Sequence, residues 1–590
     1  MSLINKGLTN PLINTYWSRP LLLQSSSVPV QWIRFKHNPR KPPPTVRKVK
    51  KRKGWLTEED PNAHNPSYKV GTFSNLLYPS KKTFETSSTG LDSIKSFNDL
   101  RIFPTVREAM IQEIKSQYNL KGPRHSSKEE LEIKPTPCQI AVVRKVNQPR
   151  ITSNFLKRVG EPMTTEEEID FEYKKQNELN KLKMFALASE TGSGKTWAYL
   201  ASILSKLKED DMELFDQDPE RLEDAKCRKV IRSVILVSTH ELVEQISQVI
   251  ERANKIDFDL KNVPKSFQNY IDGTKDKDGK SKLNIRLFKW QHGDPHTKLF
   301  HALRTGRIDI MVTTPGKIAG LQNLDRESDP FRVVRNVKYC VVDEADTLFD
   351  RNWIDETLRV VRTFGSVTDL IFCSATITKE FKNNLNKTFP QANSIIEIVT
   401  PSLHKISRNV KISVIDARLA PYNGSVMRCC AQALYSIIKD GTEEGYVKRA
   451  VIFVNQKVLV NGVIHALTKK YHFPADDIVG LNGSDSIEDR LEILDPFLKP
   501  AEKLDKEDPK ASKMKVLVTT DLLGRGVDFN GLKNVIIIDL PNSSVDLVHR
   551  IGRTGRMGQS GRVLIIVDKK GPKNKLVGIP RAVLKGMPIG

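Results

Sequence analysis

The chain has 590 residues, 38% of them hydrophobic and 7% aromatic, and this length predicts two or three globular domains rather than one. Its formal net charge is +24, but 12 Lys and Arg residues and no acidic residue lie between Met1 and Thr57, so half of the excess belongs to the N-terminal segment. The remaining excess favours a polyanionic partner over charge that only maintains solubility. Six scattered cysteines argue against a disulfide framework and a CxxC zinc site, and no run reaches the roughly 20 apolar residues of a membrane span.

The N-terminal stretch has the composition of a mitochondrial targeting segment. The first 41 residues carry Arg and Ser, lack acidic residues and have apolar residues at mixed spacing. We predict a transit peptide over residues 1–35, removed near Arg34 or Phe35, and hence a location in the mitochondrial matrix; a disordered basic arm is the alternative. Residues 36–96 are predicted to be a basic and polar linker arm, in which KPPPTVRKVKKRKGW is better explained by nucleic-acid binding than by nuclear localisation.

Short β-branched runs alternate with helical stretches along the rest of the chain, which is typical of parallel sheets joined by crossover helices. The first series of runs comprises Met184 to Ala188, Val234 to Val237, Ile308 to Val312, Val337 to Val342 and Leu370 to Cys373. The second comprises Ala450 to Val454, Ile478 to Leu481, Val516 to Val518, Val535 to Ile538 and Val563 to Val567. We therefore predict two α/β domains, over residues 97–405 and 406–590. The charged stretches KEDDMELFDQDPERLEDAKCRK and KPAEKLDKEDPKASKMK are predicted to be surface insertions.

A phosphate-binding loop is predicted at Ser189 to Thr196, whose sequence is SETGSGKT. It follows an apolar strand and leads into a helix, which is the order that a P-loop requires. Gly192 and Gly194 let the backbone turn its N–H groups toward phosphate oxygens, and the start of the helix adds positive potential. Lys195 is predicted to meet the β and γ phosphates, and Thr196 to offer its hydroxyl to Mg²⁺.

Three carboxylates, Asp343, Glu344 and Asp346, directly follow another predicted strand, in the sequence VVDEADTLFD from Val341 to Asp350. Because the run that precedes them is β-branched and apolar, they should emerge at the carboxyl edge of a buried parallel sheet, where ligands bind. A P-loop needs an acidic partner for magnesium, so Asp343 is predicted to hold Mg²⁺. Glu344 is then placed to orient and deprotonate the attacking water.

With DEAD at Asp343 to Asp346, the chain resembles the DEAD-box ATP-dependent RNA helicases, and further motifs of that family occur in the family's order. STHELVEQ, TTPGK and SAT fall in the first domain, and VIFVNQ, LNG, TTDLLGRGVD and HRIGRTGR in the second. Several ordered motifs between about Phe97 and Val567 are far more specific than any one alone. The resemblance implies two tandem RecA-like P-loop domains with parallel sheets, preceded by a basic disordered N-terminal segment.

The resemblance also implies roles in the nucleotide site. Gln139 in KPTPCQ would read the adenine, with Phe97 as a candidate to stack on it, and Arg553 and Arg556 would reach the γ phosphate when the domains close. The implied ATP contacts are Gln139, Ser189, Glu190, Thr191, Gly192, Ser193, Gly194, Lys195, Thr196 and, near the ribose, Asp528. Residues implied to couple ATP to RNA are Asp346, Ser374, Thr376 and His549, with His549 contacting the SAT segment.

An RNA surface follows from the same resemblance. The implied contacts are Thr239, Glu241, Gly293, Thr314, Pro315, Gly316, Gly483, Thr519 and Thr520, loop residues that suit a phosphodiester backbone and no particular sequence. Three positions depart from the family pattern: His240 stands where Arg is usual, His292 where a second Gly is usual, and Gly524 where Ala is usual.

Together, the motifs and the leader imply a mitochondrial RNA helicase that uses ATP and Mg²⁺ to separate short RNA duplexes. They resemble a fungal mitochondrial DEAD-box helicase associated with large-subunit assembly of the ribosome. This resemblance implies ribosomal RNA and assembly intermediates as partners and a monomeric protein. An ATP-gated RNA clamp with little unwinding and a DNA-directed helicase are the alternatives, which strand release and the choice of stimulating nucleic acid would separate.

Overall fold

In the computed structural model of the protein, the described residues are 90–91, 93–119, 133–150, 164–260, 263–323, 329, 331–350, 352–389, 395–400, 403–481, 485–505, 512–521, 527, 529, 531–541, 544–556, 559–568 and 578–586. The predicted transit peptide and nearly all of the predicted linker arm lie outside them. Among the described residues, no helix has the length and apolar character needed to cross a lipid bilayer.

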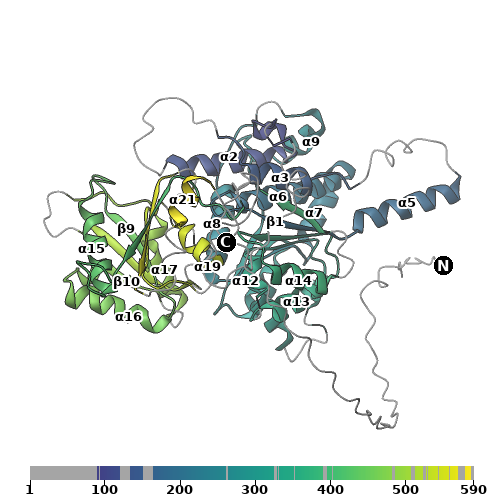
Figure 1. Cartoon of the computed structure of the whole chain (residues 1–590). Coiled ribbons are helices and arrows are strands. Elements are labelled where there is room, and N and C mark those ends of the chain that lie inside the picture. Colours follow the sequence, from purple (N-terminus) through teal and green to yellow (C-terminus); the bar gives the residue numbers. More distant parts are fainter. Residues whose placement is uncertain are drawn as a thin grey trace, which may run out of the picture. The chain divides into compact units, whose positions relative to one another are not determined.

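The described residues form two parallel sheets, each flanked by helices (Figure 1). The first sheet has seven strands in the order β3-β4-β2-β5-β6-β1-β7, and with its helices it is called the first lobe. Its strands are β1 (Lys183–Ala188), β2 (Ile231–Leu236), β3 (Leu287–Trp290), β4 (Ile308–Thr313), β5 (Tyr339–Val342), β6 (Asp369–Ser374) and β7 (Ile395–Val399).

The second sheet has six strands in the order β10-β11-β9-β12-β13-β8 and belongs to the second lobe. Its strands are β8 (Val410–Asp416), β9 (Lys448–Phe453), β10 (Ile478–Gly480), β11 (Met514–Thr519), β12 (Asn534–Ile537) and β13 (Gly561–Val567). The predicted limit between residues 405 and 406 falls between β7 and β8, and the domain limits themselves stay predictions.

Helices cover both faces of the first sheet because successive strand residues point to opposite sides, and both sides are apolar. One face, with Val341 and Ile371, packs against α2 (Pro104–Asn119), α3 (Pro137–Val146), α6 (Lys195–Gln217), α7 (Pro219–Cys227), α8 (His240–Asn254) and α9 (Lys265–Gly273). The other, with Cys340 and Val342, packs against α10 (His296–Arg304), α11 (Pro315–Ala319), α12 (Ala345–Leu348), α13 (Ile354–Thr363) and α14 (Lys379–Thr388). Helix α5 (Thr165–Asn180) has no buried residue among those whose exposure is described.

The second sheet is covered in the same way. One face packs against α17 (Ile487–Leu498), α19 (Ser544–Ile551) and α21 (Ile579–Leu584). The opposite face packs against α15 (Val426–Lys439) and α16 (Lys457–His465), the latter continuing into a π-helical turn, Ala466–Lys470. Short 3₁₀ turns occur at Phe97–Asp99, Gly320–Asn323, Arg332–Val334 and Ala475–Asp477.

The charged stretch that begins at Lys208, predicted to be a surface insertion, forms the end of α6 and all of α7, and most of it is exposed or half-buried. The prediction is wrong for two of its charged residues. Lys208 and Asp211 are buried, and Asp211 pairs with Arg307 at 2.7 Å and with Arg232 at 3.0 Å. Arg232 and Arg307 also pair with Asp309. The charges are buried because they neutralise one another, which an argument from composition overlooks.

Candidate active site

The loops that carry the predicted site residues of the first lobe leave the same edge of its sheet. Because the strands are parallel, their carboxyl ends meet along this edge, where α/β sheets bind ligands. The DEAD motif follows β5, the SAT motif follows β6 and the P-loop follows β1, and these strands are neighbours. The loops predicted to meet RNA follow β3, β4 and β2, the three strands beside them. Chain topology therefore places the two predicted sets of residues side by side.

The P-loop is wrapped around its own lysine. Gly192 and Gly194 have φ angles of +76° and +83°, in the left-handed region that favours glycine. Lys195 Nζ donates hydrogen bonds to the carbonyl oxygens of Ser189 (3.0 Å) and Glu190 (2.8 Å). The lysine charge thus lies inside the loop, at the N-terminus of a 23-residue helix, and both features favour an anion there.

The segment before α3 is tied to the P-loop. Thr136 and Gln139 form a capping box, in which Gln139 Oε1 accepts from the Thr136 N–H at 2.9 Å. Thr136 Oγ1 donates to the Ser193 carbonyl oxygen at 2.7 Å, and a Cβ on Gly194 would come 2.9 Å from Gln139 Nε2. The structure therefore brings Gln139 beside the phosphate loop. Phe97 is only 2% exposed and packs in the core of the first lobe, so it offers no open ring face for stacking on a base.

Asp343 is a buried carboxylate at the end of β5. Its Oδ2 accepts from the Tyr199 hydroxyl at 2.9 Å, and its Oδ1 accepts from the Glu344 N–H at 2.8 Å. Burial raises the pKa of Asp343 above its usual value, and the neighbouring Glu344 charge raises it further, while the hydrogen bonds and the Lys195 charge oppose the shift. A nearby cation would stabilise the charged form of this buried carboxylate.

Glu344 is held in an unfavourable backbone conformation. Its φ of 50° and ψ of 46° are left-handed, which costs a residue with a side chain about 1–3 kcal/mol. Glu344 Oε2 is buried and accepts no hydrogen bond from the described residues. Together with Asp343 and Thr196, the second residue of α6, it makes up a set of hard oxygen donors. This chemistry fits Mg²⁺, which prefers carboxylate and hydroxyl oxygens.

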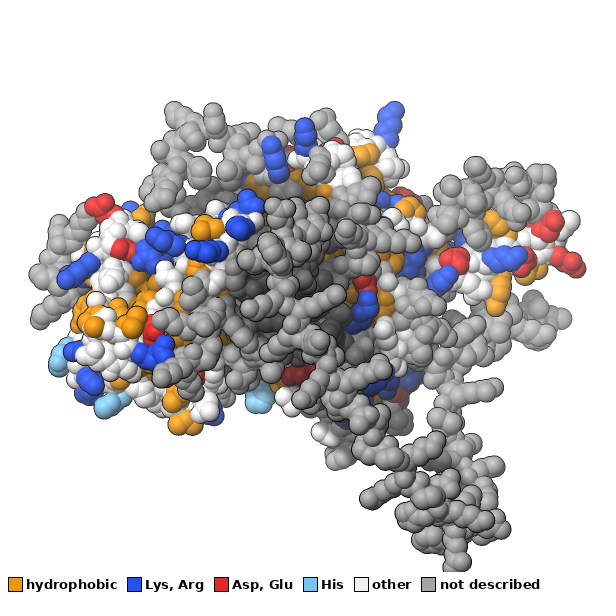
Figure 2. Space-filling model, in the orientation of Figure 1, with side chains coloured by type: hydrophobic (Ala, Val, Ile, Leu, Met, Phe, Trp, Pro, Cys, Tyr) orange, Lys and Arg blue, Asp and Glu red, His pale blue; other side chains and the backbone are white. Residues whose placement is uncertain are grey.

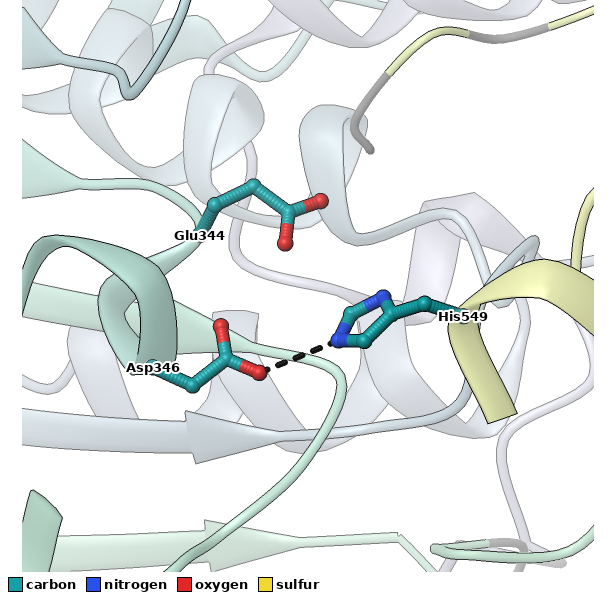
Figure 3. A group of neighbouring side chains, drawn as sticks. All are labelled: Glu344, Asp346 and His549. Carbon is teal, nitrogen blue, oxygen red and sulfur yellow. Dashed lines mark hydrogen bonds and ion pairs between the residues drawn. The ribbon is translucent and has the colours of Figure 1, made fainter. Parts of the chain in front are cut away.

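Asp346 connects the two lobes (Figure 3). Its Oδ2 accepts from Thr376 Oγ1 at 2.6 Å and lies 3.2 Å from His549 Nε2 of α19. The ligand atoms of Glu344, Asp346 and His549 lie within 4.8 Å of one another, but the dashed contact in Figure 3 runs only between Asp346 and His549. We interpret the group as a hydrogen-bond network rather than a metal site, because Asp346 Oδ2 already has two partners.

Two predictions for the coupling residues are refined by these contacts. His549 is predicted to contact the SAT segment, but its recorded bond is to Asp346, which in turn bonds Thr376. Among the described residues, the Ser374 hydroxyl bonds within its own turn, donating to the Thr376 carbonyl oxygen at 2.7 Å and accepting from the Thr376 N–H at 3.0 Å. Ser374 reaches the P-loop through its backbone instead, because its carbonyl oxygen accepts from the Ser189 N–H at 3.2 Å.

The two predicted arginine fingers lie in different surroundings. Arg556 lies against the P-loop, since a Cβ on Gly192 would come 3.1 Å from its Cγ. Arg553 is 1% exposed and donates to the carbonyl oxygens of His549 and Val527, at 3.0 and 2.7 Å. Arg553 would have to leave these bonds to reach a phosphate, whereas Arg556 is already beside the phosphate loop.

Near Arg556, the backbone of the second lobe at Gly552 lies close to Thr191 of the P-loop. A Cβ on Gly552, which follows α19, would overlap Thr191 Oγ1 and come 3.1 Å from the Val548 carbonyl oxygen. Only a glycine allows this approach, so Gly552 is required by packing between the lobes.

The predicted RNA residues of the first lobe cluster where β2, β3 and β4 end. Thr239 caps α8, accepting from the Leu242 N–H at 3.3 Å, and Gly293 is exposed with a φ of +85°. Thr314 precedes α11, which begins with Pro315 and Gly316. Thr239, Thr314 and Pro315 are buried and Gly316 is half-buried, so Gly293 is the exposed residue of this cluster.

Glu241, which is predicted to contact RNA, is buried and forms an ion pair with the second lobe. It is 2% exposed, and its Oε1 lies 2.9 Å from Nη1 of Arg490 on α17 of the second lobe. A carboxylate repels phosphate, so the ion pair explains the glutamate better than RNA contact does. Arg490 was not singled out in the sequence, because nothing local to it indicates a partner in the other lobe.

The remaining predicted RNA residues are in the second lobe. Thr519 ends β11 and is fully buried, while Thr520 is half-buried. Gly483 and the predicted ribose contact Asp528 lie outside the described residues.

The two histidines that depart from the family pattern lie together. The His292 N–H donates to His240 Nδ1 at 3.2 Å, and the ring centroids are 5.7 Å apart. Burial lowers the pKa of His240 to about 4, and the charges of Arg490 and Lys317 and the His292 ring add to the effect. His240 is therefore neutral at physiological pH.

Arg550 is a further residue that the sequence reading missed. It is 1% exposed and pairs with Asp521 at 2.5 Å, bonds Asn455 Oδ1 at 2.6 Å, and lies over the Phe453 ring at 5.5 Å. These contacts join the ends of β9 and β11 to α19. Its position inside the HRIGRTGR motif is the feature of the sequence that could have identified it.

Two family models match the chain. Residues 174–384 match the DEAD/DEAH box helicase model, and residues 430–558 match the helicase conserved C-terminal domain. The first match contains the P-loop, DEAD and SAT motifs, and the second contains His549, Arg553 and Arg556.

Relatives are similar over most of their length. The protein of Scheffersomyces stipitis named ATP-dependent RNA helicase MRH4, mitochondrial, is 52% identical over 534 residues, which cover 89% of each chain. The protein of that name from Debaryomyces hansenii is 53% identical over 90% of this chain and 91% of its own. The one from Saccharomyces cerevisiae is 32% identical over 98% of both chains.

Solved structures share the fold. Dbp5 of S. cerevisiae bound to RNA and ADP BeF3 is 20% identical and aligns over 83% of this chain and 93% of its own, with a TM-score of 0.52. Mss116p bound to ssRNA and AMP-PNP is 19% identical and aligns over 88% of this chain and 81% of its own, with a TM-score of 0.52. The predicted fold of two tandem RecA-like α/β lobes is confirmed.

Proposed function

Because the chain belongs to the DEAD-box family of ATP-dependent RNA helicases, we propose that it works in the mitochondrial matrix, where ATP hydrolysis drives local separation of RNA duplexes during assembly of the large ribosomal subunit. The bond between Asp346 and His549 supports this proposal most directly. It links the nucleotide side of the first lobe to the second lobe, as a motor that closes on ATP and RNA requires.

Catalysis is proposed to begin at the P-loop. Lys195 exchanges its bonds to the Ser189 and Glu190 carbonyl oxygens for bonds to the β and γ phosphates. The backbone N–H groups from Glu190 to Thr196 surround the same anion, and Gln139 faces the adenine from beside the loop. Binding therefore uses a cradle that is largely formed before ATP arrives.

Glu344 is the proposed general base. Its buried Oε2, which accepts no hydrogen bond within the described residues, is free to accept a proton from water, and its strained backbone fixes the direction of the side chain. Asp343 and Thr196 would hold Mg²⁺, which supplies positive charge to the phosphate oxygens when it is bound. Arg556, and Arg553 after it leaves its carbonyl partners, would neutralise the charge that develops on the γ phosphate.

RNA is proposed to lie along the ends of β2, β3 and β4 and to continue onto the second lobe through Thr520 and Gly483. Thr239, Gly293 and Thr314 would offer hydroxyl and N–H groups to the phosphates. The Glu241–Arg490 ion pair forms only when the lobes approach, so it would stabilise the closed state beside the RNA. The closed lobes would hold one RNA strand in a conformation that is incompatible with a duplex. The complementary strand would then be displaced.

The cellular setting rests on the relatives. Proteins named mitochondrial helicases are 32 to 53% identical to this chain, and the acid-free leader has the composition of a transit peptide. The basic arm after the leader would add affinity for a polyanion such as ribosomal RNA.

Crosslinking in isolated mitochondria tests this proposal. Protein bound to RNA is recovered after irradiation and the fragments are sequenced, with Lys195→Ala as the matched variant. Large-subunit ribosomal RNA among the fragments, enriched in assembly intermediates, is the expected result. Absence of the protein from mitochondria would overturn the localisation, and fragments unrelated to the ribosome would overturn the role in assembly.

A strand-release assay decides between a helicase and an ATP-gated clamp. A helicase displaces a short labelled strand in proportion to the ATP hydrolysed. A clamp would retain RNA in the presence of AMP-PNP and release almost no strand during many turnovers.

A further inference from the structure

The outer face of the second lobe, formed by α15 and α16, carries a surface that the proposed function does not use. Both helices pack on the face of the sheet opposite to α17 and α19, which carry Arg490 and His549 (Figure 1). Whatever binds there cannot be in contact with the nucleotide, because the sheet lies between.

Tyr435 on α15 is the centre of this surface. Its ring stacks on Phe473, with centroids 4.5 Å apart and an interplanar angle of 30°, and its hydroxyl donates to the Tyr471 carbonyl oxygen at 2.8 Å. Phe473 is buried, yet Tyr435 remains 42% exposed. The ring is therefore fixed at both ends while a large apolar part of it faces water, although burial would be worth about 25 cal/mol per Å².

Basic residues lie on α15 and on the segment that leads to Phe473. Arg428 and Lys439 are exposed on α15 at positions that share the face of Tyr435, seven residues before it and four after it. Lys470 lies 5.8 Å from the Tyr471 ring, and the neighbouring His472 is exposed. Figure 2 shows hydrophobic side chains over α15 and α16, with Lys, Arg and His side chains and a few Asp and Glu side chains around them.

Asp440, the acidic residue that follows Lys439, is already neutralised. Asp440, at the end of α15, lies 2.7 Å from Lys448 Nζ and 2.5 Å from Arg562 Nη2. Its charge is therefore matched by two cations. The exposed charges that remain on α15 and near Phe473 include Arg428, Lys439 and Lys470, opposed by Asp476. An exposed, immobilised aromatic ring with lysines on either side is what single-stranded nucleic acid uses for base stacking and phosphate contact.

We propose that α15 and the segment from Lys470 to Phe473 form a second binding site for single-stranded RNA, in which an unpaired base stacks on Tyr435 and the flanking phosphates meet Lys439 and Lys470. This site would hold the enzyme on its RNA while the lobes open after each turnover. The inference rests on the proposed function only in taking RNA as the ligand. It concerns a different face of the protein.

The test is RNA binding by the full chain in the absence of nucleotide, measured by fluorescence anisotropy with an unstructured labelled RNA. Tyr435→Ala is expected to weaken binding by about 5- to 100-fold, as loss of one stacked base does. Tyr435→Phe keeps the ring and should bind as the wild type does. Tyr173→Ala is the matched control, because Tyr173 on α5 is 65% exposed and the two lysines that follow it, Lys174 and Lys175, are paired with Asp170 and Glu172.

Charge is tested separately. Replacing Lys439 and Lys470 by Gln should lower the slope of log affinity against log salt by about 1 to 1.5, since each phosphate contact with a single strand contributes about 0.7. RNA that carries 4-thiouridine should crosslink to a peptide containing Tyr435 or Tyr471. ATP turnover at saturating RNA should stay at the wild-type rate in these variants.

Unchanged affinity in Tyr435→Ala, with no crosslink near Tyr435, would overturn the second site. If this variant binds RNA normally but no longer binds a protein partner, the second RNA site is also overturned. The surface is then a protein-docking surface. If the wild-type protein shows no RNA-stimulated turnover but Tyr435→Ala still binds RNA more weakly, the proposed function fails and the second site stands.

Discussion

His549 Nε2 of the second lobe lies 3.2 Å from Asp346 Oδ2 of the first, and the same oxygen accepts the Thr376 hydroxyl at 2.6 Å. One carboxylate oxygen therefore connects α19 of the second lobe to the loops that follow β5 and β6 of the first lobe. Because a bond between the two lobes exists only when they meet, it stabilises the closed state alone.

Replacing His549 by Ala should uncouple RNA binding from ATP turnover. We expect RNA stimulation of hydrolysis to fall by about 5- to 150-fold, the usual range for a lost coupling contact, with little change in ATP affinity. Turnover with and without RNA, and binding of a fluorescent ATP analogue, measure the two effects. His301→Ala, at an exposed position on α10, is the control. Full RNA stimulation in His549→Ala would show that the bond carries no coupling.

The Glu241–Arg490 pair should stabilise the closed complex with RNA. Each single substitution to Ala leaves one buried charge without its partner, and we expect RNA affinity in the presence of AMP-PNP to fall by about 10-fold or more. The double variant should lose less than the sum of the two. Without nucleotide, none of the three should change RNA affinity. Strict additivity in this double-mutant cycle would contradict the ion pair.

Gly552→Ala should separate the lobes at the P-loop. The added Cβ overlaps Thr191 Oγ1, and such overpacking costs about 1–3 kcal/mol, so turnover should fall by about 5- to 100-fold. Thermal melting should stay close to that of the wild type, because the contact lies between lobes. Gly462→Ala, inside α16 with no atom within 4 Å of the new Cβ, is expected to be silent. Equal turnover in both variants would refute the close approach.

How much of this fold could be predicted from the sequence depends on where each strand lies. The interior strands are largely apolar runs, and they were predicted, as was the edge strand β10. The three missed strands, β3, β7 and β8, are each at an edge of a sheet. Edge strands are partly exposed, so polar residues such as Lys289 in β3 and Glu397 in β7 interrupt the apolar pattern.

The candidate site likewise has a part that the sequence predicts and a part that it does not. The P-loop and the DEAD motif are local in sequence, and their loops lie together at the sheet edge as predicted. Contacts between lobes, such as Glu241 with Arg490, join distant segments and leave no local pattern. Lys208 and Asp211 were misplaced for the same reason, since their partners come from other strands.

The low pKa of His240 predicts that the free energy of unfolding depends on pH. Below the ordinary histidine pKa of about 6.5 the unfolded chain takes up a proton that the folded chain refuses until about pH 4, so His240 destabilises the fold progressively as the pH falls through this range. His240→Asn should remove that part of the loss. Urea unfolding at pH 7.5 and pH 5 compares the two proteins, and His301→Asn is the control. An equal loss of stability in wild type and His240→Asn would contradict the assignment.

Glu344 is the residue on which the account depends most. The rate of ATP hydrolysis by the full chain, with and without RNA, is measured for the wild type and for Glu344→Gln, alongside RNA binding in AMP-PNP. We expect RNA to accelerate the wild type, and the variant to lose about 10²–10⁴-fold in turnover, as removal of a general base does, while it binds RNA normally. Undiminished, RNA-stimulated turnover in Glu344→Gln would contradict the assignment of the active site.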